Sequence, residues 1–167
     1  MSEWELCLRI LIAGGFGLAL GVERERFHKS AGLRTHMIVC VASALLATSS
    51  LALGEKIGAR GEALRVAAGV VTGIGFIGAG VIIQTSGQVH GLTTAATVFM
   101  SAALGLTVGS GFYWLAGTAA LLTILANYGL GLLESKVEHK TESPAVEGEP
   151  HPRRLGRPAS SRPDPGA

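Results

Sequence analysis

The stretch Gly73-Ile-Gly75-Phe-Ile-Gly78 decides the fold of this chain, because it permits two opposite interpretations. As a string it matches the G-x-G-x-x-G fingerprint of a dinucleotide-binding turn. Such a turn needs a strand before the glycines, a helix that starts at them and an acid about twenty residues further on. Here the glycines lie inside residues 66–133, which contain no Asp, Glu, Lys or Arg. The sequence therefore favours a membrane helix over a nucleotide-binding turn.

Charged and apolar residues are separated along the whole chain. The overall content, 48% hydrophobic and 16% charged, is ordinary, but the charges gather at residues 23–34, 55–65 and after 133. A surface helix of a soluble protein would combine an apolar stripe with a polar face. A chain of 167 residues cannot hide several all-apolar helices in a soluble core. We therefore predict an all-α, polytopic membrane bundle. A net charge of +2 gives no reason to expect a nucleic-acid partner.

Five apolar segments reach the length of at least about 17 residues that a membrane helix requires. The predicted spans are 6–22, 37–53, 66–83, 92–108 and 112–133. The last two are joined by Gly109-Ser-Gly111, which suits a tight turn between antiparallel helices. A signal peptide is the alternative for the first segment, but the acidic start Met1-Ser-Glu-Trp-Glu argues against it. Residues 1–135 are thus predicted to form one transmembrane domain.

The composition changes at residue 136. All six prolines lie in residues 136–167, mixed with Glu, Arg, Ser and Gly. Such a segment cannot bury enough apolar surface to offset its ordering entropy, so we predict a disordered tail. The first loop and the near tail together hold six Lys and Arg, against four in the second loop and near the N-terminus. The positive-inside rule then predicts that the C-terminus is cytoplasmic and the N-terminus outside.

Small residues form stripes on two of the predicted helices. The third span has two stripes that lie beside each other. The first contains Gly69, Gly73 and Gly80. The second contains Ala68, Thr72, Gly75 and Ala79. The first span carries Gly14, Gly17 and Gly21. Membrane helices use small residues to approach one another closely. Two stripes therefore predict two close neighbours and place the third helix at the centre of the bundle. The alternative is a broken helix that lines an ion path.

A run of charges, Glu23-Arg-Glu-Arg26, follows the first span directly. Carboxylates at the C-terminus of a helix oppose its macrodipole, so this placement is locally unfavourable. One interpretation is a solvated collar that anchors the span. The other is that Glu23 turns inward to pair with Arg34 or His36. A locally unfavourable placement that is kept in the sequence indicates a candidate functional position.

Hydroxyl groups recur on the fourth span at Thr93, Thr97 and Ser101, at i, i+4 and i+8. We expect them to bond their own backbone, with bonds between helices as the alternative. The sequence offers no catalytic set, because Asp164 in the tail is its only aspartate. Mg²⁺ prefers carboxylates and waters, and arginines flank Glu23 and Glu25. We therefore predict no cofactor and no bound metal.

Three stretches together resemble the MgtC/SapB family of bacterial inner-membrane proteins. The first stretch combines residues 21–26 with residues 31–36, the second is residues 65–80, and the third is residues 89–97. The candidate functional residues within them are Glu23, Arg24, Glu25, Arg26, Arg34, Thr35, His36, Gly73, Gly75, Gly78, Gly80, Thr93, Thr94 and Thr97. The resemblance implies a multi-pass inner-membrane protein linked to growth in low magnesium and survival in phagocytes. Some members bind and restrain the membrane ATP synthase.

Two departures limit what the resemblance implies. Longer members carry a folded cytoplasmic domain after the fifth span, whereas residues 136–167 are Pro-rich, and Phe99 stands where the family often has Trp. The favoured function is a non-enzymatic regulator that contacts a membrane partner through its helices. That partner would be the ATP synthase by resemblance, another membrane protein or a second copy. The competing function is a transporter or channel for Mg²⁺ or another cation, and a nucleotide-using enzyme is the third.

Overall fold

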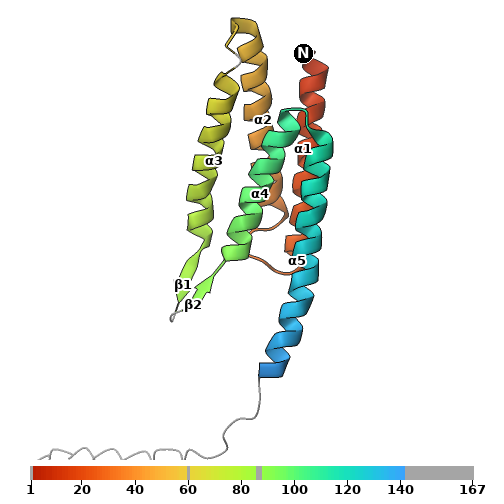
Figure 1. Ribbon diagram of the computed structural model, residues 1–167, viewed down its shortest axis with the longest axis vertical. Helices are drawn as coiled ribbons and strands as arrows, with labels where there is room; N and C mark the ends of the chain where they lie inside the picture. Colours follow the sequence, from red (N-terminus) through yellow and green to blue (C-terminus); the bar gives the residue numbers. More distant parts are fainter. Residues whose placement is uncertain (1, 60, 86–87, 142–167) are drawn as a thin grey trace, which may run out of the picture.

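Five helices and a short β ribbon make up the computed structural model, which describes residues 2–59, 61–85 and 88–141, with side chains as far as Gly129. The elements are α1 Glu3–Arg26, α2 Leu33–Ile57, α3 Glu62–Val81, β1 Ile83–Thr85, β2 Gln88–His90, α4 Leu92–Gly109 and α5 Tyr113–Thr141. The helices run up and down along the long axis (Figure 1). One end carries the loop from α1 to α2 and the β ribbon, and we call it the ribbon end.

The predicted membrane spans coincide with helices. The four helices α1 to α4 are long and apolar enough to cross a membrane. The fifth predicted span, 112–133, lies almost entirely within α5, and its crossing stays a prediction. Helix α5 continues to Thr141, past the predicted start of the tail at residue 136. Residues 142–167 lie outside the described residues, so their disorder stays a prediction.

The core lies where α1, α2 and α4 meet. Gly17 allows α1 to lie against α2, because a Cβ there would be 2.7 Å from Met37 Cα. Gly109 likewise allows α4 to lie against α2, because a Cβ there would be 2.6 Å from the Ala44 carbonyl oxygen. The largest buried cluster contains Ala13, Leu20, Cys40, Ala44, Leu104, Val108, Ala116 and Ala120. Small residues thus bring three helices into close contact, as the stripe on the first span predicted.

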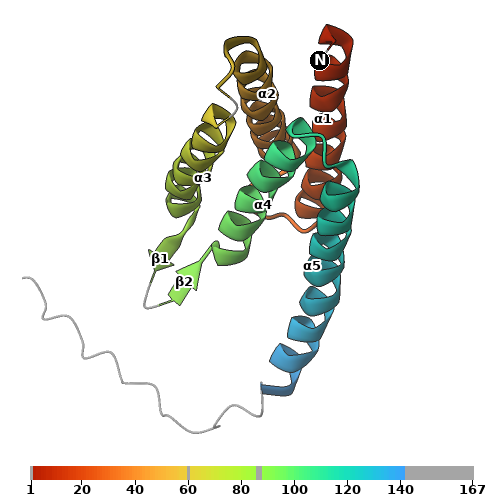
Figure 2. The same cartoon turned by 45° about the horizontal axis from the view of Figure 1, so that its top comes forward.

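Helix α3 stands at the edge of the bundle, and the prediction that it forms the centre is wrong (Figure 2). Only 11% of its most apolar window is buried, against 50% for α4. Within α3, Ile74 and Gly78 are the buried residues. The stripe pattern shows how closely a helix can be approached, but it does not show which surface approaches it. Helices α2 and α4 occupy the central position instead.

The two hairpins differ in how well the sequence predicted them. The turn at Gly109–Gly111 is as tight as expected, and Gly111 adopts the left-handed φ of 90°. Arg9 of α1 holds this turn by donating from Nη1 to the Gly109 carbonyl oxygen at 2.9 Å. A cation at the C-terminus of α4 is favourable for the helix dipole. The loop from α3 to α4, by contrast, is an antiparallel ribbon in which Ile83 pairs with His90.

Candidate functional site

A buried ion pair lies at the ribbon end of the bundle. Glu23 and Arg24 are only 6% and 3% exposed, although they follow each other in the sequence. The Arg24 Nε and Nη2 atoms donate to the two carboxylate oxygens of Glu23, both at 2.6 Å. Glu23 therefore does turn inward, but the residue that forms an ion pair with it is Arg24. The predicted pairing with Arg34 or His36 is wrong, and Arg34 is exposed.

Asn127 of α5 completes the environment of the carboxylate. Its Nδ2 donates to Glu23 Oε2 at 3.3 Å and so joins α5 to α1. Beside it, Tyr128 packs edge-on against Phe27 with ring centroids 5.5 Å apart. Our sequence analysis missed Asn127. The signal was present, because it is the only asparagine of the chain and lies in an apolar segment, where polar residues are rare and functional.

His36 ties α2 to α4 next to this pair. Its side chain is fully buried and lies within electrostatic range of Arg24 and Glu23. The Nδ1 atom lies 2.8 Å from the Gly32 carbonyl oxygen. A carbonyl can only accept, so Nδ1 carries a proton. The other ring nitrogen, Nε2, lies 3.4 Å from Thr97 Oγ1.

The hydroxyl stripe of α4 serves both of the roles considered for it. Thr97 Oγ1 donates to the Thr94 carbonyl oxygen at 2.9 Å, and Ser101 Oγ donates to the Thr97 carbonyl oxygen at 3.1 Å. Thr97 also reaches His36 of α2, which is the interhelical contact. Thr93 is exposed on the same helix. The stripe thus stabilises its own turn of helix and contributes one side chain to the buried cluster.

Glu25 has a role separate from that of Glu23. Its Oε2 accepts from the Leu33 backbone N at 2.9 Å, at the first turn of α2. A carboxylate is favourable at a helix N-terminus, where backbone N–H groups lack partners. Gly32 leaves the room that this carboxylate occupies. Arg26 is exposed and Thr35 is half-buried. The acids that are unfavourable at the end of α1 are therefore used inside the bundle or at the start of α2.

The glycine motif lies apart from this cluster. Gly73 to Gly78 lie within α3, with no strand before them, so the nucleotide-turn interpretation has no structural support. Gly78 packs on Ala95 of α4, with a Cβ position 3.7 Å from the Ala95 Cβ. Gly73, Gly75 and Gly80 are exposed, and a Cβ on any of them meets nothing within 4 Å. The motifs therefore form two separate regions, a polar cluster and an open glycine face.

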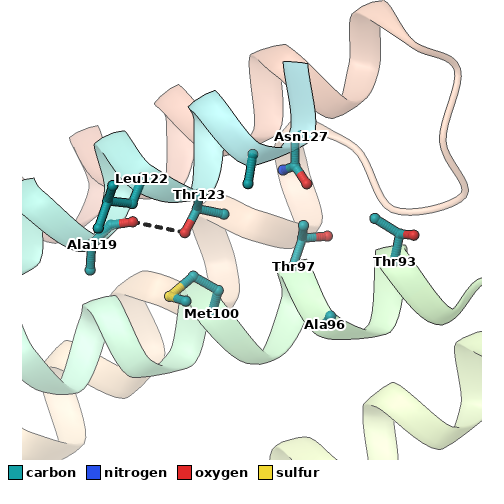
Figure 3. Close-up of a pocket in the computed structure, with 9 residues that line it drawn as sticks. Thr93, Ala96, Thr97, Met100, Ala119, Leu122, Thr123 and Asn127 are labelled. Atoms are coloured by element: carbon teal, nitrogen blue, oxygen red, sulfur yellow. Dashed lines mark hydrogen bonds between the residues drawn. The ribbon is translucent and has the colours of Figure 1, made fainter. Parts of the chain in front are cut away.

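Two grooves open between helices. One, of about 560 Å³, lies between α2 and α3 and includes Gly69 and Gly73. The other, of about 410 Å³, lies between α4 and α5. Figure 3 shows its polar residues Thr93, Thr97 and Asn127 together at one end. The rest of its wall is formed by Ala96, Met100, Ala119, Leu122, Thr123 and Ala126.

The chemistry of the cluster follows from its hydrogen bonds. Both oxygens of Glu23 already accept from Arg24, and one also accepts from Asn127, so this carboxylate is well satisfied. Arg24 Nη1 is buried and has no hydrogen-bond partner. Among the described residues, no group of three or more His, Cys, Asp or Glu is placed to hold a metal ion. The arrangement favours positioning of helices and recognition over metal ligation.

Comparison with known proteins decides the family. The model of the MgtC family matches residues 10–136, which include the polar cluster and the glycine motif. The chain belongs to the MgtC family. This confirms the resemblance drawn from the motifs, and with four helices able to cross a membrane it identifies an integral membrane protein.

The relatives of this MgtC-family chain include proteins with different names. It is 39% identical over 125 residues to the "Putative magnesium transporter YhiD" of Escherichia coli K12, covering 72% of this chain and 58% of the relative. It is 42% identical over 119 residues to "Protein MgtC" of Brucella abortus, covering 70% of this chain and 48% of the relative. It is 38% identical over 144 residues to "Protein SrpB" of Synechococcus elongatus, covering 80% of this chain and 79% of the relative. The chain spans about half the length of the first two relatives. No solved structure matches it.

Proposed function

We propose that this chain is a non-enzymatic regulator that binds a transmembrane helix of another membrane protein through the glycine face of α3. This face is the stripe of Gly69, Gly73 and Gly80 beside the groove between α2 and α3. The observation that carries the proposal is the open space at these three glycines, where an added Cβ meets nothing within 4 Å. Glycines on other helices, such as Gly17 and Gly105, touch neighbouring helices instead. A helix face of small residues allows another backbone to approach closely. The glycine face of α3 suits a partner helix from outside the bundle.

We place this activity in a bacterial inner membrane, with the ribbon end and the C-terminus in the cytoplasm. Support comes from the exposed Arg26, Lys29 and Arg34, which gather at the ribbon end, because cytoplasmic loops carry an excess of Lys and Arg. The family resemblance makes the ATP synthase the first partner to probe. A second copy of the chain is the alternative partner.

Filling the glycine face is expected to abolish partner binding without unfolding the bundle. The double substitution Gly73→Leu and Gly80→Leu adds side chains where a Cβ meets no neighbour within 4 Å. The matched control is Gly15→Leu on α1, where a Cβ is equally free. After crosslinking in membranes and co-purification, partner recovery should fall at least about tenfold for the double variant, a change of about 1.4 kcal/mol. Equal recovery from the double variant and the control would contradict the proposal.

A second candidate function, cation transport, is favoured by the burial of Glu23, which is 6% exposed inside the helical bundle. Intramembrane carboxylates mark ion paths in many transporters. The hydrogen bonds from Arg24 and Asn127 oppose this role, because they occupy the oxygens that a cation would need.

The test of this candidate is Mg²⁺ flux into liposomes that contain the purified chain. A regulator predicts the same flux as in empty vesicles. A transporter predicts a clear excess that the substitution Glu23→Gln removes. Flux in the wild-type chain would therefore replace the regulator proposal with the transporter.

A further inference from the structure

The groove between α4 and α5 separates its polar and apolar residues along its length. Because α4 and α5 run antiparallel, Thr93 and Asn127 lie at the ribbon end of the groove, while Met100 and Ala119 lie toward the middle of the bundle. Figure 3 shows the amide of Asn127 and the hydroxyls of Thr93 and Thr97 gathered at that one end. The hydroxyls of Thr97 and Thr123 are already used, because they donate to the carbonyl oxygens of Thr94 and Ala119 at 2.9 Å and 2.8 Å. Away from the ribbon end, the groove therefore presents apolar surface.

Free hydrogen-bonding capacity remains at the polar end. Asn127 uses its Nδ2 to reach Glu23, and its amide oxygen is a second polar group on the groove wall. Thr93 is exposed on the α4 wall of the same groove. The polar end of the groove is thus suited to a hydrogen-bonding head group.

Two exposed basic residues lie near this end among the side chains that the structure describes. The ring contact between Phe27 and Tyr128 places the end of α1 beside the polar end of the groove. Arg26 and Lys29 are exposed there, and Glu23 and Glu25 are engaged with Arg24 and with the start of α2. Exposed basic residues at a membrane surface attract anionic lipids.

We propose that the groove between α4 and α5 binds an anionic phospholipid. One acyl chain lies along Ala96, Met100 and Leu122, and the glycerol and phosphate region meets Thr93 and Asn127 at the ribbon end. Arg26 and Lys29 balance the charge of the head group. The groove volume of about 410 Å³ falls within the usual range of about 300–1,000 Å³ for small-molecule sites. This site is on the opposite side of α4 from α3, so it does not depend on the partner of α3.

The test uses photoreactive lipids in liposomes that contain the full chain. Phosphatidylglycerol and phosphatidylcholine, each with a photoreactive acyl chain, are compared, and the labelled peptides are mapped. We expect phosphatidylglycerol to label α4 and α5 around Ala96 and Ala126 in preference to phosphatidylcholine. Ala96→Trp fills the groove and should reduce this labelling about tenfold, since displacing two buried methylene groups changes binding by about that factor.

Three further measurements make the outcome decisive. Leu121→Trp, at an exposed position of α5 outside the groove, should leave the labelling unchanged. The double variant Arg26→Gln and Lys29→Gln, at exposed positions, should remove the preference for phosphatidylglycerol even if Ala96→Trp fails to fold. Equal labelling by the two lipids in the wild-type chain, labelling spread evenly over the bundle, or capture of a protein by a photoreactive residue at position 96 would each overturn the proposal.

Discussion

Replacing Gly17 by alanine is expected to destabilise the bundle by about 1–3 kcal/mol. The added Cβ would lie 2.7 Å from Met37 Cα and 2.8 Å from the His36 carbonyl oxygen, both of which belong to the backbone of α2. Neither atom can rotate away, so the two helices must separate. Because α1 and α2 bury much of the core together, this loss spreads to their contacts with α4.

The matched control is Gly73→Ala on α3. There the added Cβ meets nothing within 4 Å, and alanine is the better helix former by about 0.8–1.0 kcal/mol in helical peptides. Denaturant titration of both variants in the same detergent, followed by circular dichroism, compares their stability. Gly17→Ala should unfold at a lower midpoint than the wild type, and Gly73→Ala should not. Equal midpoints would contradict the assignment of α1 to the core and α3 to the edge.

Replacing Glu23 by glutamine is expected to cost about 3–5 kcal/mol, because it leaves the buried Arg24 charge without a counter-charge. Arg24 is 3% exposed and both of its bonds to Glu23 are 2.6 Å long, so water cannot substitute for the carboxylate without rearrangement. The substitution keeps the size of the side chain, so the loss reports on charge and not on packing. The same denaturant titration measures it.

Two variants test this explanation. Glu62→Gln removes the acid of an exposed pair on α3, in which Arg65 Nη1 lies 3.3 Å from Glu62 Oε1, and should cost at most about 1 kcal/mol. Adding Arg24→Gln to Glu23→Gln removes the stranded charge and should recover part of the lost stability. If Glu23→Gln behaves like Glu62→Gln, or if the double variant is the less stable one, the ion pair does not have the role described.

The helices were predictable because a membrane segment needs only length and the absence of charge. Their ends were less so, since α1 runs to Arg26 although its apolar part ends near residue 22. Backbone hydrogen bonds continue past the apolar boundary, and the carboxylate of Glu25 marks where α2 begins. The first loop is therefore shorter than the charge pattern indicates.

The position of α3 could not be predicted from its stripes. Glycine stripes on α1 and α3 look alike in the sequence, yet Gly17 touches α2 and Gly73 touches no neighbour. Periodicity identifies a face but not the surface that covers it. Two glycines of α4 also pack against α2, and the sequence analysis does not predict this, since it assigns Gly105 to an apolar span and Gly109 to a turn.

The candidate site was predictable in part. The conflict between Glu23 and the helix dipole left two interpretations open, a solvated collar and an inward carboxylate, and the structure has the inward carboxylate. Its partner was missed because neighbouring residues on a helix normally point apart, whereas the long Arg24 side chain folds back onto Glu23. Asn127 was missed because it is 104 positions away from Glu23 in the sequence, and no local pattern links them.

The central claim is that the glycine face of α3 is the surface that contacts a membrane partner. In-membrane photocrosslinking tests it most directly, with a photoreactive residue at Gly73 on α3 and, for comparison, at the exposed Leu121 on α5. We predict a specific adduct with another transmembrane protein or a second copy from position 73, and none from position 121. Labelling of lipid alone from position 73, or the same protein adducts from both positions, would contradict the claim.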